Sequence, residues 1–321
     1  MIDHAHMQER NIINLNSHGW LGFELSVLRR FKFSSAALAL SGEPNLGLAL
    51  KRWGVRVNAN DPAQWAWVKS IAFIENNSEM LNEHDIEKLL DDTYVPRSSF
   101  SNPSLSQWFN ETDAWWFDNL RANAELFDSP HKRALALSLG MMTGDYVFSF
   151  NQDTRELRQP LILPDVLRRL WLTLPSPVNN QHRNRSSNRE IKDFLAERQD
   201  DLLFLRLPRA NVGDTRSARM LAWREEWVRQ GRGFWSDMAK DRAGKLGAHV
   251  VTRDQYLNQI EDVLRTASHM QTWAIEAVGD GFVSTEELIE CVRELRKVDA
   301  VYTKDFSELL GVRAVIITAS A

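Results

Sequence analysis

The sequence predicts an α/β fold in which a mixed, mostly parallel sheet is flanked by helices and interrupted by a helical insertion. Short apolar runs alternate with stretches whose apolar residues recur at helical spacing, which is typical of such sheets. The last two apolar runs, at 298–302 and 312–318, form a hairpin-like end to the chain. These two observations predict the fold class.

The first half shows the alternation most clearly. An apolar strand at 36–40 is followed by a turn at 41–45, a helix to Trp53 and a short strand at 55–58. This is a strand-turn-helix-strand unit. Helical spacing then continues from Ala63 to about Asn76 and again over 83–90.

The middle of the chain is predicted to be helical and then irregular. Two helices, at 112–127 and 131–148, are separated by the breaker Asp128-Ser129-Pro130. The segment 151–190 loses periodicity and contains four prolines, so it is expected to be irregular. After it, the predicted elements are helices at 190–199, 217–230, 254–267 and 284–297, with strands at 202–207 and 272–278.

Four parts of the chain follow from this pattern. They are an N-terminal extension (1–34), a first α/β part (35–80), a helical and irregular insertion (81–190) and a second α/β part (191–321).

Composition excludes several classes of protein. The 321 residues are 43% hydrophobic and carry a net charge of -4, so no general basic field indicates nucleic acid. The single cysteine rules out an intramolecular disulfide framework, and the eight histidines lack metal-ligand spacing. The chain starts without an apolar signal stretch and contains no run of about 18 apolar residues. We therefore expect a cytoplasmic protein that binds neither metal nor membrane.

Charge is nevertheless uneven along the chain. Residues 151–245 contain sixteen Arg and three Lys against thirteen acidic residues, a net charge of +6, which leaves -10 for the remainder. Such a stretch favours a phosphate-binding surface, because guanidinium groups bind phosphate in a bidentate manner. Scattered solvated arginines explain the count equally well.

The loop after the first predicted strand reads Leu38-Ala39-Leu40-Ser41-Gly42-Glu43-Pro44, and the second strand ends at Asn60-Asp61. This pattern resembles the Dam-like bacterial DNA adenine methyltransferases, over roughly 35–150 and 190–320. In that family a glycine-rich loop holds S-adenosylmethionine and an acidic residue binds its ribose. The resemblance implies a Rossmann-like methyltransferase fold, with Gly42 and Asp61 as vestiges of the cofactor site.

The family's Asp-Pro-Pro-Tyr motif corresponds to Arg206-Leu207-Pro208-Arg209 in the strand DLLFLRLPR. In the family, acceptors polarise the exocyclic amine of a flipped adenine, and the tyrosine stacks on the base. Arg206 has no acceptor, and its charge opposes a nearby sulfonium. The sequence therefore predicts no catalytic residues, no bound cofactor and no methyl transfer.

The function expected from this resemblance is that of a catalytically degenerate, nucleic-acid-binding or partner-binding component of a bacterial restriction-modification or defence system. Either a group of arginines lines a positive cleft that contacts DNA, or Arg206 pairs internally with an acid such as Asp61. The arginines of the first interpretation are Arg183, Arg185, Arg189, Arg206 and Arg209.

Two other interpretations stay open. One is an enzyme: an active S-adenosylmethionine-dependent DNA adenine methyltransferase with a rebuilt site, or another activity using Asp61, Glu43 and Glu190. The other is a protein-interaction module retained beside an active partner.

Overall fold

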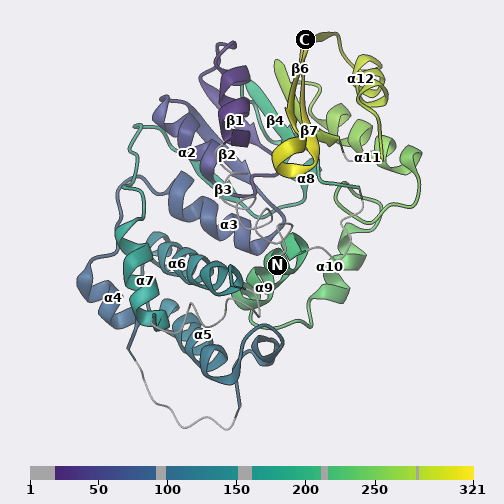
Figure 1. The fold of residues 1–321 in the computed structure, drawn as a ribbon. Helices are drawn as coiled ribbons and strands as arrows, with labels where there is room; N and C mark the ends of the chain where they lie inside the picture. The colour runs from purple at the N-terminus through teal and green to yellow at the C-terminus, as the bar shows by residue number, and fades with distance from the viewer. Residues whose placement is uncertain (1–18, 92–98, 151–160, 211–215, 280–281) are drawn as a thin grey trace.

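A computed structural model describes residues 19–91, 99–150, 161–210, 216–279 and 282–321 (Figure 1). Within these ranges the strands form one seven-stranded sheet of order β3-β2-β1-β4-β5-β7-β6. β7 runs antiparallel to both of its neighbours, and the other pairings are parallel. This confirms a mixed, mostly parallel sheet of the Rossmann-like kind. The strands are β1 (Ser35–Leu38), β2 (Arg56–Asn60), β3 (Arg185–Ser187), β4 (Leu202–Arg206), β5 (Thr272–Gly279), β6 (Val298–Phe306) and β7 (Val312–Ser320).

Helices cover both faces of the sheet and form a further layer beyond its edge. Residues 19–28 form the first described helix. The others are α2 (Asn45–Arg52), α3 (Gln64–Ser70), η1 (Ile71–Glu75), α4 (Glu83–Leu89), η2 (Pro103–Gln107), α5 (Glu111–Ala124), α6 (Pro130–Phe148), α7 (Leu163–Leu172), α8 (Ile191–Ala196), α9 (Arg216–Arg229), α10 (Trp235–Arg242), α11 (Arg253–Thr266), α12 (Thr285–Arg293) and α13 (Ser307–Leu310). No described helix has the length and apolar character that a membrane crossing requires.

The central strands are apolar on both sides because helices cover both of their faces. In β4, Leu203 and Leu205 belong to the core under α8, α11 and α12. Leu202 and Phe204 point to the opposite core, which includes residues of α2 and of helix 19–28. The part of the chain assigned by sequence to an N-terminal extension therefore contributes a helix that packs against the sheet.

A separate helical layer lies below the sheet in Figure 1 and is built mainly from α3 to α7 and α9. Trp223 and Trp227 of α9 are fully buried in its core. Their rings pack against Gly144 and Gly140 of α6, where an added Cβ would lie 2.2 Å from a ring atom. Glycine is therefore the residue that allows α9 to approach α6 this closely.

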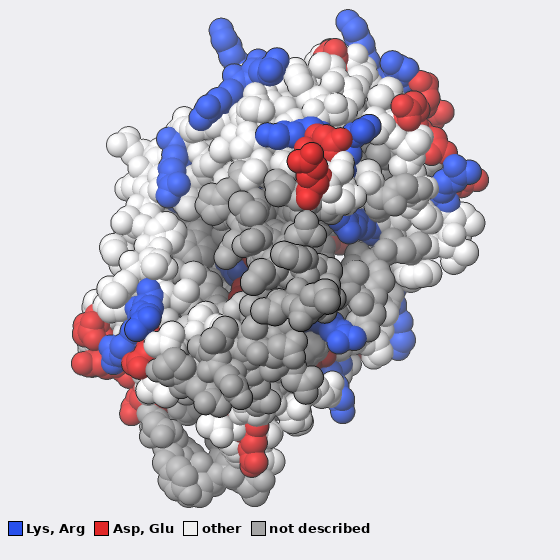
Figure 2. Space-filling view, in the orientation of Figure 1, with Lys and Arg blue, Asp and Glu red and all other residues white. Residues whose placement is uncertain are grey.

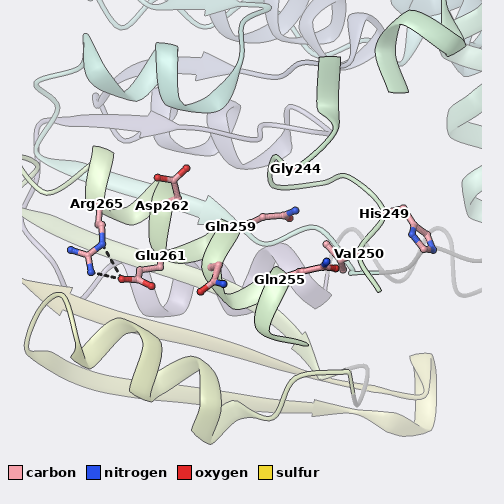
Figure 3. A pocket seen from close by; sticks show the side chains of 9 residues that line it. Gly244, His249, Val250, Gln255, Gln259, Glu261, Asp262 and Arg265 are labelled. Atoms are coloured by element: carbon pink, nitrogen blue, oxygen red, sulfur yellow. Dashed lines mark hydrogen bonds and ion pairs between the residues drawn. The ribbon is translucent and has the colours of Figure 1, made fainter. Parts of the chain in front are cut away.

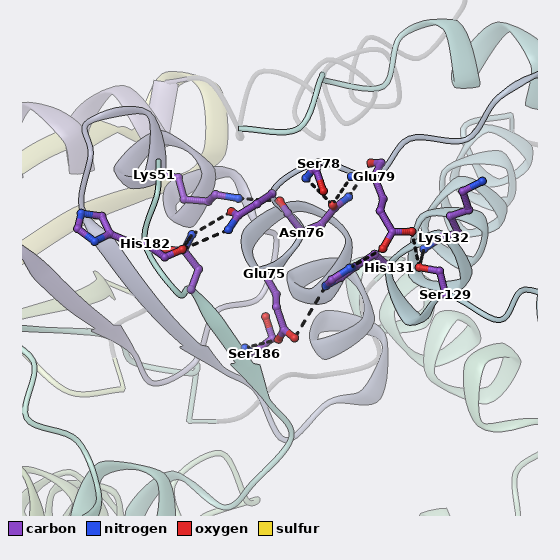
Figure 4. A network of polar contacts seen from close by, with 12 residues as sticks. Lys51, Glu75, Asn76, Ser78, Glu79, Ser129, His131, Lys132, His182 and Ser186 are labelled. Carbon is purple, nitrogen blue, oxygen red and sulfur yellow. Dashed lines mark hydrogen bonds and ion pairs between the residues drawn. The ribbon is translucent and has the colours of Figure 1, made fainter. Parts of the chain in front are cut away.

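A polar network joins this layer to the edge of the sheet (Figure 4). Glu75 of η1 accepts a hydrogen bond from the backbone nitrogen of Ser186 in β3, at 2.8 Å. The His131 ring at the start of α6 lies 3.1 Å from Glu79 and 3.9 Å from Glu75. These contacts fix the segment after α3 between β3 and α6.

The prediction of an irregular segment at 151–190 is wrong for two elements, and 151–160 lie outside the described residues. α7 forms a helix because Pro164 occupies its first turn, where a missing N–H costs little. β3 is a three-residue polar strand that pairs with β2, Arg185 opposite Asn58. α10 was also missed.

Candidate functional site

The loop after β1 folds back onto the end of β2. Gly42 has a φ of 54°, a left-handed conformation that glycine adopts without strain. Its backbone nitrogen donates to a carboxylate oxygen of Asp61 at 2.9 Å. The nitrogen of Ser41 donates to the carbonyl of Asn60, also at 2.9 Å. The two residues proposed from sequence as cofactor vestiges, Gly42 and Asp61, are thus bonded to each other.

Asp61 is a buried carboxyl group held by backbone donors. It is 8% exposed and also accepts from the backbone nitrogen of Ala63 at 2.9 Å. Burial raises the pKa of Asp61 to about 6, although the hydrogen bonds from Gly42 and Ala63 oppose this shift.

This pKa gives a testable pH dependence. Folded Asp61 keeps its proton up to about pH 6, whereas the unfolded chain releases it near the ordinary value of 3.8. Its contribution to stability is therefore present at low pH and is lost as pH rises through 6. Relative to Asp61→Asn, the wild-type free energy of unfolding should fall by about 3 kcal/mol over this range.

Urea unfolding of both proteins between about pH 3.5 and pH 7 measures this difference. In Asp61→Asn, the amide nitrogen cannot accept one of the two backbone hydrogen bonds. This loss lowers the free energy of unfolding by the same amount at every pH, so it does not affect the pH dependence. The control is Asp262→Asn, because Asp262 is exposed. Parallel pH curves for wild type and Asp61→Asn would contradict the assignment.

Arg206, at the end of β4, is enclosed by two buried carboxylates. Its Nη2 lies 2.6 Å from Glu24, and its Nε donates to Glu24 at 2.7 Å and to Glu276 at 3.1 Å. Its Nη1 donates to the carbonyl of Ser41 at 2.9 Å. The side chains of Glu24 and Glu276 are 1% and 3% exposed. We call Arg206, Glu24 and Glu276 the Arg206 cluster.

The cluster assembles from three distant segments. Glu276 stands opposite Arg206 in the β4–β5 pairing. Glu24 comes from helix 19–28, and Trp20, one turn earlier, donates its indole N–H to Glu276. Burial, and then the charge of Glu24, raise the pKa of Glu276 well above its usual range. Burial therefore disfavours a second negative charge beside Glu24.

A second ion cluster joins the β1 loop to the helical layer. Glu43 accepts from Lys69 at 2.9 Å and from Arg224 of α9 at 2.7 Å. Arg224 also binds Asp145 of α6. Burial alone would raise the pKa of Glu43, but Lys69 and Arg224 lower it to about 2. We call these four residues the Glu43 cluster, and it holds the loop against α9.

The residues of the alternative enzyme interpretation have structural partners. Asp61 and Glu43 are bonded as described above. Glu190 caps α8, where its carboxylate accepts from the backbone nitrogens of Lys192 and Asp193. All three carboxylates thus hold loops or helix ends in place.

The arginines proposed from sequence lie on or after different strands of the sheet. Arg185 lies on β3 and Arg206 on β4, with β2 and β1 between them, so their strands are about 14 Å apart. Arg189 pairs with Glu197 at 2.6 Å. Arg183 and Arg209 are exposed. Arg206 is paired internally, as the second interpretation expected, but its partners are Glu24 and Glu276 in place of Asp61.

The groups present do not fit S-adenosylmethionine, the cofactor that the resemblance implies. The N–H of Gly42 is already donated to Asp61, and the carbonyl of Ser41 accepts from Arg206. Pro44 has no N–H to offer. The guanidinium of Arg206 would oppose a cationic sulfonium. The Gly42 N–H, the Ser41 carbonyl and the Arg206 guanidinium therefore all make contacts within the protein.

A wide polar hollow of about 560 Å³ lies along α11 (Figure 3). It is lined by the amides Gln255, Asn258 and Gln259 and by the ion pair of Glu261 with Arg265. None of the residues of the Arg206 cluster lines it. Among the described residues, no group of three or more potential ligands is arranged to hold a metal ion.

The chain was compared with known proteins. No protein-family model matches it. No curated protein matches it either. The assignment of function therefore depends on the geometry of the site.

Proposed function

We propose that this protein is a catalytically degenerate relative of the DNA adenine methyltransferases that acts by binding, as a component of a bacterial DNA modification or defence system. The observation that carries the proposal is the Arg206 cluster. Arg206 ends β4, and the proposal takes this position to correspond to the family's catalytic motif. Its guanidinium is held by Glu24 and Glu276.

The arrangement of the strands supports this proposal. The order β3-β2-β1-β4-β5-β7-β6 places the antiparallel β7 between β5 and β6, as expected for a methyltransferase-like sheet. Asp61 follows the second strand, at the position of the family's acidic residue. Fold alone does not determine function, so the chemistry of the site decides between an active and a degenerate enzyme.

That chemistry favours a degenerate enzyme. Methyl transfer to adenine needs acceptors that polarise the exocyclic amine. Arg206 offers only donors, and each carboxylate that could accept beside it is buried and bonded to it. A guanidinium there also disfavours the approach of a second cation. Because methyl transfer is disfavoured, we propose that the protein acts by binding.

The direct test is transfer of a tritiated methyl group from S-adenosylmethionine to unmethylated duplex DNA, with an active adenine methyltransferase as positive control. We expect no incorporation above that of a sample without protein. Incorporation that rises with protein concentration and is lost in Asp61→Ala would replace this proposal with an active enzyme that has a rebuilt site.

A further inference from the structure

Exposed cations gather at the edge of the sheet opposite the Arg206 cluster. Arg29, Arg30 and Lys32 lie in the segment between helix 19–28 and β1, and Arg52 ends α2. All four are exposed. In Figure 2, basic side chains gather at the upper left, over the segment that leads into β1 and over α2. We call these four residues the basic end.

Two of these guanidinium groups are held over aromatic rings. The Cζ of Arg29 lies 5.3 Å from the ring centre of Trp53, and that of Arg30 lies 5.1 Å from the ring centre of Tyr302. A cation–π contact restricts the side chain without using the N–H donors of the guanidinium. Less side-chain freedom is then lost when the N–H groups bind a ligand.

Two carboxylates near the basic end, Asp200 and Asp201, have partners other than its four cations. Asp201 accepts from the backbone and hydroxyl of Ser34 and from the backbone of Ser35. Asp200 is buried beside Arg56. Within the described part of the chain, no ion pair involves any of the four cations of the basic end.

We propose that the basic end binds the phosphate backbone of a nucleic acid. Arg29 and Arg30 would each bind a phosphate in a bidentate manner, and Lys32 and Arg52 would neutralise neighbouring phosphates. The rings beneath the guanidiniums add surface on which a base of a single strand can stack. The partly exposed Trp53 suits this role, because 36% of its surface is accessible.

Such contacts attach the protein without reading sequence. Because the chain carries a net charge of -4, only a local surface of this kind can supply the attraction. The proposal goes beyond the closed methyltransferase-like site, since it uses none of that site's residues. Either proposal can fail while the other stands.

Fluorescence anisotropy tests this surface with two labelled probes, a single-stranded DNA of about 20 nucleotides and the matching duplex, in about 50 to 200 mM salt. Wild type should bind at least one probe, with affinity that falls as salt rises. Arg29→Ala with Arg30→Ala should bind at least tenfold more weakly, and the slope of log K against log salt should become shallower by about 1.4–1.8.

Two further variants separate charge from geometry. Arg29→Lys with Arg30→Lys keeps the charge but not the planar fork, so it should retain the salt slope while losing part of the affinity. Arg265→Ala with Arg293→Ala removes the same charge from exposed sites on α11 and α12 and should bind like wild type. Thermal melting of each variant confirms that it folds.

Three results would overturn the proposal. They are no binding of either probe by wild type, equal binding by the Arg29/Arg30 alanine variant, and an equal loss in the α11/α12 control. Binding to phosphatidylserine vesicles without binding to either DNA probe would instead assign the basic end to a membrane surface.

Discussion

Replacing Arg206 with Leu is expected to lower the free energy of unfolding by about 3–5 kcal/mol, the usual loss when one partner of a buried ion pair is removed. The variant leaves Glu24 and Glu276 facing each other without their cation. Protonation relieves that repulsion, so the deficit should be smaller near pH 4.5 than near pH 8. Urea unfolding at both pH values measures it.

The matched control for this variant is Arg189→Leu. Arg189 is an arginine in an ion pair as well, but its partner is the single carboxylate of Glu197. Both groups of this pair are exposed to solvent. Its loss should therefore change stability by less than about 1 kcal/mol. Equal effects of Arg206→Leu and Arg189→Leu would mean that the Arg206 cluster is no more than a surface ion pair.

Replacing Trp227 with Ala is expected to destabilise the helical layer by about 3–5 kcal/mol. The ring is fully buried against Gly140, and its indole N–H donates to the carbonyl of Phe117 at 2.9 Å. The change therefore opens a cavity and removes the indole donor from the carbonyl of Phe117. Chemical unfolding followed by far-ultraviolet circular dichroism measures the loss.

Two variants bracket this result. Trp227→Phe fills most of the cavity but cannot donate the hydrogen bond, so it should lie between wild type and Trp227→Ala. Leu172→Ala, on α7 at 76% exposure, should change stability by less than about 0.5 kcal/mol. A loss after Trp227→Ala as small as that after Leu172→Ala would show that α9 is not packed as described.

The alternation of strands and helices was predictable because most elements bury an apolar face or run. β1 and β4 are apolar except for one terminal residue each, and such strands belong to the centre of a parallel sheet. β3 was missed because its three polar residues carry no alternation. α7 is not predictable from the proline count, because Pro164 sits in the first turn of the helix, where proline does not break it.

The site was predictable only in part. The apolar run before Arg206 places this residue at the end of a central strand. That its side chain offers only hydrogen-bond donors follows from the residue type alone. Its partners were not visible in the sequence, because Glu24 lies 182 positions away and Glu276 lies 70 positions away. Only the register of β4 on β5 and the packing of helix 19–28 bring these carboxylates to the guanidinium.

Under the proposed function, the Arg206 cluster also limits how methyl transfer could arise at this position. Arg206, Glu24 and Glu276 depend on one another, so restoring an acidic residue at position 206 would place three carboxylates together. Like charges so close and so buried are strongly disfavoured. A return to catalysis would therefore require coordinated changes in helix 19–28, β4 and β5.

The central claim is that internal ion pairs have replaced the cofactor and catalytic groups. Isothermal titration of the wild-type protein with S-adenosylmethionine tests it most directly. We predict no saturable heat up to about 1 mM cofactor, a limit that corresponds to binding weaker than about 4 kcal/mol. A micromolar dissociation constant with one site per chain would contradict the account and establish a functioning cofactor site.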